Sequence, residues 1–281
     1  MSVFVVGSLH LDVVLRAPHL PGLDETVTGT AVDYVFGGKG GNQAVAAARM
    51  GADVRFAGRA GSDRFGDMIR EVLQTSGVDL SQLQHDAGPS GMSAAIINAG
   101  GDYGAVIVSA ANLNIDADRI EVPAGTSLVL LQNEIPEAVN LAVARKARAA
   151  GARVWLNGAP ARALPDALVA LVDLLIVNRV EAEFYAHGTR FCRVLTTLGA
   201  EGVEFEGNGY PGHQVEVMST HGAGDMFVGA LAAQVDAGQS MAEAIGFAQA
   251  AAALHVSLDE AGRARLDAAR VGAFLAAQDS R

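Results

Sequence analysis

Residues 219–231 have the sequence STHGAGDMFVGAL, in which Gly222 and Gly224 come just before Asp225. A run with two valines, residues 215–217, precedes this stretch, and an apolar, alanine-rich segment follows it. The pattern predicts a strand, a glycine turn and the start of a helix. Glycines leave backbone N–H groups open, and a helix N-terminus adds unpaired donors and the positive end of its dipole. The stretch therefore predicts an anion-binding site.

Asp225 has two interpretations, because a carboxylate at an anion site repels a phosphate. It can be a base that accepts the proton of an attacking hydroxyl. It can also be an ordinary acidic residue that stabilises a helix N-terminus. The stretch alone leaves both open.

The composition limits the class of protein. The chain has 281 residues, of which 50% are apolar and 18% are charged, with 33 glycines, as is typical of an α/β enzyme. The net charge of -11 argues against nucleic acid or an anionic membrane as partner. The one cysteine, Cys192, suits a reducing compartment, and neither a signal peptide nor an apolar membrane span is evident. We expect a cytoplasmic protein.

Apolar runs predict strands at residues 3–8, 54–58, 128–132, 153–157 and 174–177, and helical patterns predict helices at 65–75, 137–150 and 165–172. This alternation predicts a mostly parallel, doubly wound sheet with helices on both faces. Short β-like segments at 93–98 and 105–109, with 10–16 and 27–36, predict a small separate sheet. Glu134, Asn157 and Asn178 come at strand ends, where such folds bind ligands.

A second glycine turn precedes a helical pattern at residues 44–50. Its sequence is FGGKGGNQ over residues 36–43. It is no P-loop, because Gly40 rather than Ser or Thr follows Lys39, and it lacks the G-x-G-x-x-G spacing.

With these two turns in place, the chain resembles the ribokinase-like (PfkB) carbohydrate kinases over essentially its whole length. The matching motifs are GGKGGNQAVAAA (37–48), LNGAPAR (156–162), NRVEAE (178–183), TTLGAEGV (196–203) and GAGDMF (222–227). The resemblance implies a single kinase domain over residues 1–281, with a β-sheet lid from about residues 10–36 and 91–110. It also implies transfer of the γ-phosphoryl group of ATP to a primary hydroxyl of ribose or a similar small sugar.

The resemblance also implies roles for individual residues. Asp225 would be the base, and the backbone of Gly222, Ala223 and Gly224 the anion hole. Mg²⁺ would be held by Glu181 and Asn178, largely through water, although by themselves these two residues favour a strand end and a helix cap. The nucleotide would contact Asn178, Thr197, Gly199, Gly224 and Gln249. The sugar would contact Asp12, Gly38, Lys39, Asn42 and Glu134, and also His10, which replaces the asparagine of the family.

Several departures from the family pattern bear on regulation and substrate. Ser219 and the loop at 258–261 differ from the family's monovalent-cation site, so we expect no strong activation by K⁺. Gln249 replaces the usual residue near the adenine. The connection at residues 184–195 is too short for the family's extra helix. We expect residues 191–195 to form the next strand and an apolar surface to be left, which a partner covers or which alters the nucleotide site.

Two other functions stay open at this point. One is a ribonucleoside kinase of the same fold, because the same contacts can hold a ribosyl group. The other is a catalytically weak sensor of a sugar or nucleotide. In either case the partners would be small molecules, and the lid suggests a homodimer.

Overall fold

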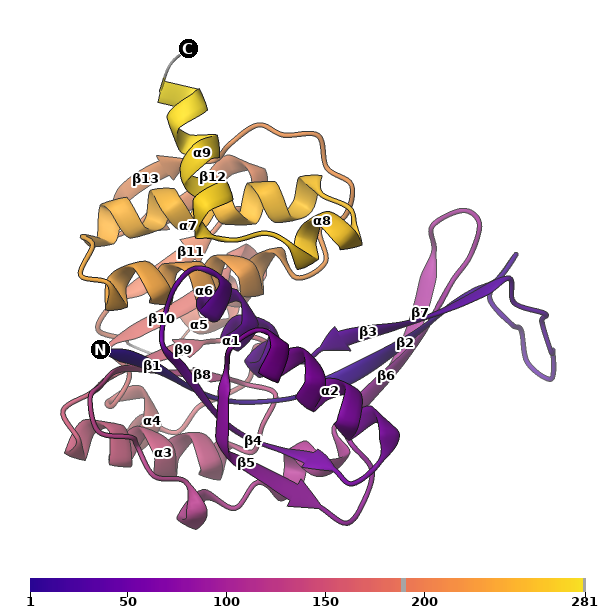
Figure 1. The fold of residues 1–281 in the computed structure, drawn as a ribbon, viewed down its shortest axis with the longest axis horizontal. Coiled ribbons are helices and arrows are strands. Elements are labelled where there is room, and N and C mark those ends of the chain that lie inside the picture. Colours follow the sequence, from indigo (N-terminus) through magenta and orange to yellow (C-terminus); the bar gives the residue numbers. More distant parts are fainter. Residues whose placement is uncertain (188–190, 280–281) are drawn as a thin grey trace.

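A nine-stranded sheet runs through the middle of the computed structural model, which describes residues 1–187 and 191–279 (Figure 1). The strand order is β13-β12-β11-β10-β9-β8-β1-β4-β5, and only β12 and β13 run antiparallel to their neighbours. The expected doubly wound, mostly parallel sheet is therefore confirmed. The strands are β1 (Ser2–Val6), β4 (Val54–Gly61), β5 (Asp79–Asp86), β8 (Thr126–Gln132), β9 (Arg153–Asn157), β10 (Leu174–Asn178), β11 (Val194–Thr197), β12 (Gly202–Phe205) and β13 (Asn208–Pro211).

Continuous apolar runs explain the central strands. β1 is buried along its whole length, and β8 and β10 are buried at four or more successive positions. Strands covered on both faces need such runs, because both sets of alternating side chains face apolar neighbours. Glu134, Asn157 and Asn178 accordingly lie where the apolar runs end.

Helices cover both faces of the sheet and form two apolar cores with it. One face packs against α1 (Lys39–Arg49), α2 (Arg64–Thr75), α6 (Ala223–Asp236), α7 (Met241–Ser257) and α9 (Ala268–Asp279), with α8 (Glu260–Ala264) between the last two. The other face packs against α3 (Glu137–Ala149), α4 (Asp166–Val169) and α5 (Arg179–Ala186). None of the helices in the described ranges is long and apolar enough to cross a membrane.

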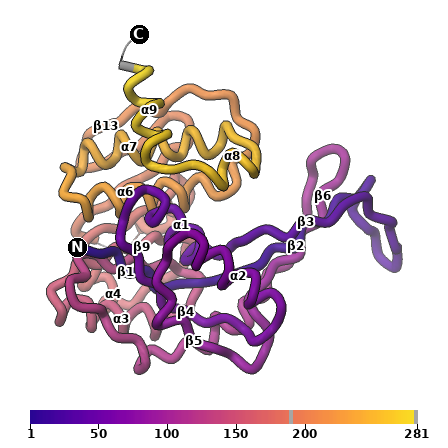
Figure 2. Tube along the Cα trace, viewed as in Figure 1, coloured from indigo at the N-terminus to yellow at the C-terminus, as the bar shows by residue number. Residues whose placement is uncertain are grey.

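A second, four-stranded sheet projects from one side of the molecule (Figures 1 and 2). Its order is β3-β2-β6-β7, from β2 (His10–Arg16), β3 (Ala31–Gly37), β6 (Met92–Ile97) and β7 (Tyr103–Val108). The turn between β6 and β7 is closed by Asn98, whose Oδ1 accepts from the N–H of Gly100 and of Asp102. The small separate sheet is confirmed, and each expected range overlaps one of its four strands, with bounds that differ by up to four residues.

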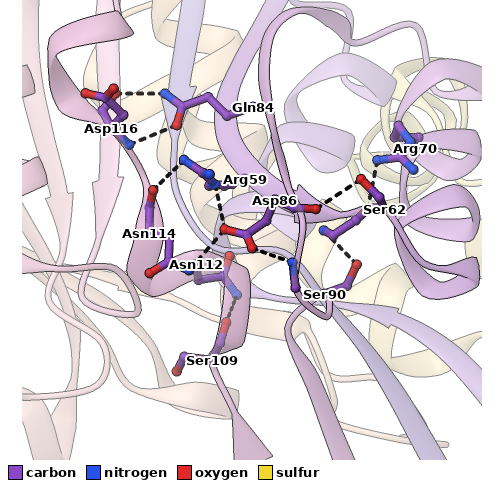
Figure 3. A network of polar contacts seen from close by, with 12 residues as sticks. Arg59, Ser62, Arg70, Gln84, Asp86, Ser90, Ser109, Asn112, Asn114 and Asp116 are labelled. Atoms are coloured by element: carbon purple, nitrogen blue, oxygen red, sulfur yellow. Dashed lines mark hydrogen bonds and ion pairs between the residues drawn. The ribbon is translucent and has the colours of Figure 1, made fainter.

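A polar network anchors the base of the small sheet (Figure 3). The guanidinium of Arg59 on β4 pairs with Asp86 on β5 at 2.8 Å and donates to the carbonyl of Asn114. Asn112 donates to the carbonyls of Leu9 and Ser109, which lie just before β2 and just after β7. Both chain ends of the small sheet are thus held at one asparagine of the 3₁₀ turn η1 (Ala110–Asn114).

One expected strand is absent, and one expected helix begins earlier than the sequence pattern indicates. Residues 215–217 form no strand; the chain from 212 to 220 is irregular. The valine pattern misled because its residues line a cavity instead of pairing in a sheet. The helix expected at 44–50 begins at Lys39, because the turn glycines Gly40 and Gly41 are themselves helical and packed against buried backbone and side chains.

The short connection before β11 leaves the sheet intact, although residues 188–190 lie outside the described residues. β11 begins at Val194, three residues later than the expected strand at 191–195. On the face covered elsewhere by α3, α4 and α5, the residues of β11 and β12 are Val194, Thr196 and Glu204. Thr196 is half-buried and Glu204 is exposed, whereas Val194 is 39% exposed and Phe184 on the neighbouring α5 is 47% exposed. The expected apolar surface stays a prediction.

Candidate active site

The N-terminus of α6 has the backbone geometry that the expected anion site needs. Gly222 is its N-cap residue, with a left-handed φ of 75°, and a Cβ there would lie 3.2 Å from Nε2 of His255. Glycine suits this position for both reasons. The N–H of Ala223 donates to the carbonyl of Thr220 at 3.3 Å, whereas the N–H groups of Gly224 and Asp225 have no acceptor in the described chain. These last two donors are available to an anion.

Asp225 is buried directly behind those donors, with 8% of its surface exposed. Its Oδ1 accepts from Nε2 of Gln43 at 2.9 Å, and its Oδ2 accepts from Nδ2 of Asn42 at 3.2 Å. Burial raises the pKa of Asp225 above its ordinary value, and the charge of Lys39 and the two amide hydrogen bonds offset part of that rise. A carboxylate with a raised pKa is better suited to accept a proton than an exposed one.

The turn that precedes α1 brings the expected sugar contacts beside Asp225. A Cβ at Gly40 would lie 2.6 Å from the backbone N of Ser8, so the turn packs directly on the end of β1. Glu134 then accepts from Oγ of Ser8 at 2.5 Å and from the backbone N–H of Lys39 at 2.8 Å. This places Glu134, Lys39 and Asn42 around one side of the buried carboxylate.

His10 and Asp12 come from β2, on the same face of the small sheet, because they are two positions apart. Asp12 Oδ1 accepts from Oγ of Ser93 at 2.5 Å, and a Cβ at Gly37 would lie 2.4 Å from Asp12 Oδ2. Asp12 therefore lies against the glycine turn that leads to Gly38 and Lys39. The Nε2 of His10 is buried without a hydrogen-bond partner among the described residues.

Asn178 and Glu181 form a capping box at the start of α5. Asn178 Oδ1 accepts from the N–H of Glu181 at 2.9 Å, and Glu181 Oε2 accepts from the N–H of Asn178 at 2.9 Å. The helix-cap interpretation is therefore correct, and it does not exclude the other. Burial raises the pKa of Glu181, although the Asn178 hydrogen bond and the charge of Lys39 oppose the rise.

A cavity of about 140 Å³ joins these groups. It is lined by Lys39, Asn157, Asn178, Glu181, Gly222, Ala223, Gly224 and Asp225, among others. No cluster of three or more acidic, histidine or cysteine side chains that could hold a metal occurs in residues 1–187 and 191–279. Glu181 and Asn178, side by side on this cavity, fit Mg²⁺, which keeps several of its waters and needs few protein ligands.

A second cavity of about 290 Å³ adjoins the first, and Thr197, Thr220, Ala223 and Gly224 line both. Its walls are largely apolar, with Val203, Phe227 and Val256, as a planar base requires. Gly199 and Gln249 also line it, and the Nε2 of Gln249 donates to the carbonyl of Tyr210 at 2.8 Å. The residues expected to contact the nucleotide therefore surround these two connected cavities.

Sequence analysis gave no role to Ser8, Gln43 and Gln132, which also belong to this arrangement. Gln43 is fully buried and bonds Asp225, Asn157 and Gln132. The available signal was a glutamine inside an alanine-rich helix, directly after Asn42, where an apolar residue would be ordinary.

Comparison with known proteins gives a consistent family. Residues 1–267 match the family described as "pfkB family carbohydrate kinase". Ribokinase from Bacillus subtilis (strain 168) is 33% identical over 271 residues, which cover 91% of this chain and 92% of that protein.

Solved structures show the same similarity. Ribokinase from Thermotoga maritima is 27% identical with a TM-score of 0.87, covering 98% of this chain and 99% of that one. Arabidopsis thaliana ribokinase complexed with ribose and ATP is 29% identical with a TM-score of 0.87, covering 98% of each chain. The chain belongs to the pfkB family of carbohydrate kinases.

Proposed function

We propose that this protein transfers the γ-phosphoryl group of ATP to a primary hydroxyl of ribose or a similar small sugar. The observation that carries the proposal is the position of Asp225. Its carboxylate is buried at the start of α6, where the backbone N–H groups of Gly224 and Asp225 have no acceptor among the described residues. The similar proteins named ribokinase, one of them solved with ribose and ATP, support the choice of both substrates.

In the proposed reaction Asp225 accepts the proton of the sugar hydroxyl as its oxygen attacks phosphorus. The N–H groups at the start of α6 stabilise the negative charge on the transferring phosphoryl group. Phosphoryl transfer depends mainly on alignment and charge neutralisation, which a fixed helix end and a positioned carboxylate provide.

The sugar hydroxyls would bind to Asp12, Asn42, Glu134 and the Gly38–Lys39 turn, with His10 as an additional contact. Carboxylates and amides are suitable partners for a polyol, since they accept and donate hydrogen bonds in fixed directions. The base and phosphates of ATP would occupy the two connected cavities. Mg²⁺ would be held by Glu181 and Asn178 and would neutralise phosphate charge.

The small sheet would act as the lid over the sugar and as the surface of a homodimer. Three successive residues of β7, Val106, Ile107 and Val108, are at least 49% exposed, which favours an apolar partner surface. Light scattering of the wild type against Ile107→Lys tests the homodimer. The expected cytoplasmic location rests on the single cysteine, which suits a reducing compartment.

The test is ADP release from Mg·ATP with ribose, deoxyribose, fructose, 2-keto-3-deoxygluconate, adenosine, cytidine and pseudouridine. We expect turnover on free ribose or another small sugar. A strong preference for a nucleoside would mean that the acceptor is a ribonucleoside and not a free sugar. Measurable ATP binding without turnover on any acceptor would support the sensor function instead.

A further inference from the structure

Gln43 holds the buried carboxylate through a chain of side-chain amides. Its Nε2 donates both to Oδ1 of Asp225 at 2.9 Å and to Oδ1 of Asn157 at 3.0 Å. Its Oε1 accepts from Nε2 of Gln132 at 2.9 Å. Gln43 and Gln132 are fully buried, so no solvent replaces these bonds.

The orientation of these side-chain amides is fixed at Asn157. Asn157 Nδ2 donates to the backbone carbonyl of Ile176 at 3.0 Å, and a carbonyl can only accept. The Oδ1 of Asn157 must therefore face Gln43 and needs a donor there. Gln43 thus directs its NH₂ group towards Asn157 and Asp225, and both N–H bonds of that group are used.

The other oxygen of Asp225 is held less firmly. Asn42 is only half-buried, its bond to Oδ2 is longer at 3.2 Å, and its own Oδ1 has no partner in the part of the chain that the structure describes. Its amide can therefore rotate to accept a proton from Oδ2, whereas the amide of Gln43 cannot rotate without breaking its bond with Asn157. A proton on Oδ2 is consequently tolerated, and a proton on Oδ1 would oppose the N–H of Gln43.

We propose that Gln43 is a positioning residue for proton transfer, which keeps Oδ1 of Asp225 as an acceptor and leaves Oδ2 to take the proton of the substrate hydroxyl. This rests on the proposed function. In the step, the hydroxyl O–H bond breaks and a new O–H bond forms at Oδ2. The substrate oxygen bonds to the γ-phosphorus, and the bond to the bridging oxygen breaks with its electron pair leaving on ADP.

The electrostatic surroundings agree with this role. The Gln43 hydrogen bond lowers the pKa of Asp225 against the larger upward effect of burial. Lys39 lowers it as well, and Glu134 raises it. Glu181 is the other titratable group coupled to Asp225 at this cavity. Loss of the Gln43 donor should therefore leave Asp225 easier to protonate and less often in its basic form.

The test compares Gln43→Met, which keeps the length of the side chain, with Gln84→Met. Gln84 is a matched control, because it is also buried and bonds Asp116 through both ends of its amide far from Asp225 (Figure 3). Gln43→Glu is a second variant of nearly unchanged shape. The readouts are kcat, KM for ATP and acceptor, the pH profile of kcat/KM, and the ¹³C shift of the Asp225 carboxyl against pH, assigned with Asp225→Asn.

We expect Gln43→Met to lower kcat by about 10- to 100-fold with both KM values nearly unchanged, because it weakens base catalysis and not binding. The acidic limb and the ¹³C titration of Asp225 should move up by about one pH unit. Gln43→Glu should move them in the same direction, and Gln84→Met should not.

Folded Gln43 variants with wild-type kcat and an unshifted Asp225 titration would overturn the proposal, as would an equal shift in Gln84→Met. The ¹³C titration decides this even without turnover. Failure of the proposed function would show differently, as an absence of turnover in the wild type or full activity in Asp225→Asn.

Discussion

Asn42 and Asp225 are 183 positions apart in the sequence, and Nδ2 of Asn42 donates to Oδ2 of Asp225 at 3.2 Å. This bond joins the glycine turn before α1 to the start of α6. The residue expected to hold the sugar therefore touches the residue expected to activate its hydroxyl. In the proposed reaction, sugar binding and proton transfer would therefore involve the same carboxylate oxygen.

Replacement of Asn42 by alanine should weaken sugar binding and misplace the attacking hydroxyl. We expect KM for the sugar to rise about 10-fold, as for loss of one hydrogen bond, with KM for ATP unchanged. Initial-rate kinetics with each substrate varied in turn measure this. Asn208→Ala, at an exposed asparagine of β13, is the control; equal effects in the two variants would contradict the assignment.

The raised pKa of Asp225 has a consequence for stability. A carboxyl whose pKa is higher in the folded than in the unfolded protein destabilises the fold above the folded pKa, and the penalty is relieved as pH falls through it. Asp225→Asn removes the charge, so it should stabilise the protein at pH 7.5 by about 1 to 2 kcal/mol. The gain should shrink as pH falls towards the unfolded pKa. Urea unfolding at several pH values measures it, and a loss of stability at pH 7.5 would count against the burial argument.

Gly222 should tolerate no side chain. An alanine there would need a left-handed backbone and would place Cβ 3.2 Å from Nε2 of His255. We expect Gly222→Ala to cost about 1 to 2 kcal/mol of stability and to lower turnover by displacing the N–H groups of α6.

Gly246→Ala is the matched control for Gly222. It lies within α7, where a Cβ meets nothing within 4 Å, so it should stabilise by about 0.5 to 1 kcal/mol. Thermal unfolding and kcat of both variants provide the comparison. A Gly222→Ala protein as stable and active as the Gly246→Ala protein would refute this account of the turn.

We expect no activation by K⁺ beyond that given by Na⁺ or choline at equal ionic strength. Arg263 already supplies a cation near the anion site: its Nη2 donates to the carbonyl of Ser219 at 2.9 Å, and its Nε to that of His255 at 2.8 Å. Asp259 instead caps α8, through Gly262. Rates measured in the three salts test this, and a large, saturable increase with K⁺ alone would contradict it.

Much of the fold was predictable because its signals are local. Buried strands such as β1 are unbroken apolar runs, and Gly100 and Gly101 indicate the turn between β6 and β7. The absence of a strand at 215–217 was not predictable, because the same valine pattern serves a pairing strand and a cavity wall. Which role applies depends on long-range contacts, here the hydrogen bonds of Met218 and Ser219 to the carbonyl of Val256.

The residues of the candidate site also include some that the sequence predicts and some that it does not. Gly222, Asp225 and the turn around Lys39 could be found from glycine spacing and the resemblance that it supports. The contacts of Gln43 could not, because they depend on Asn157 and Gln132, which are more than 80 positions away along the chain. The residues of β11 and β12 that share a face could not be predicted for a related reason, since they depend on how the two strands pair.

The central claim is that Asp225 is the base of the transfer, and Asp225→Asn tests it most directly. Equilibrium binding of ATP and of the sugar should stay within a few-fold of wild type, while kcat on the best acceptor should fall by about 10²- to 10⁴-fold. Unchanged kcat in a folded variant that binds both substrates would contradict the account.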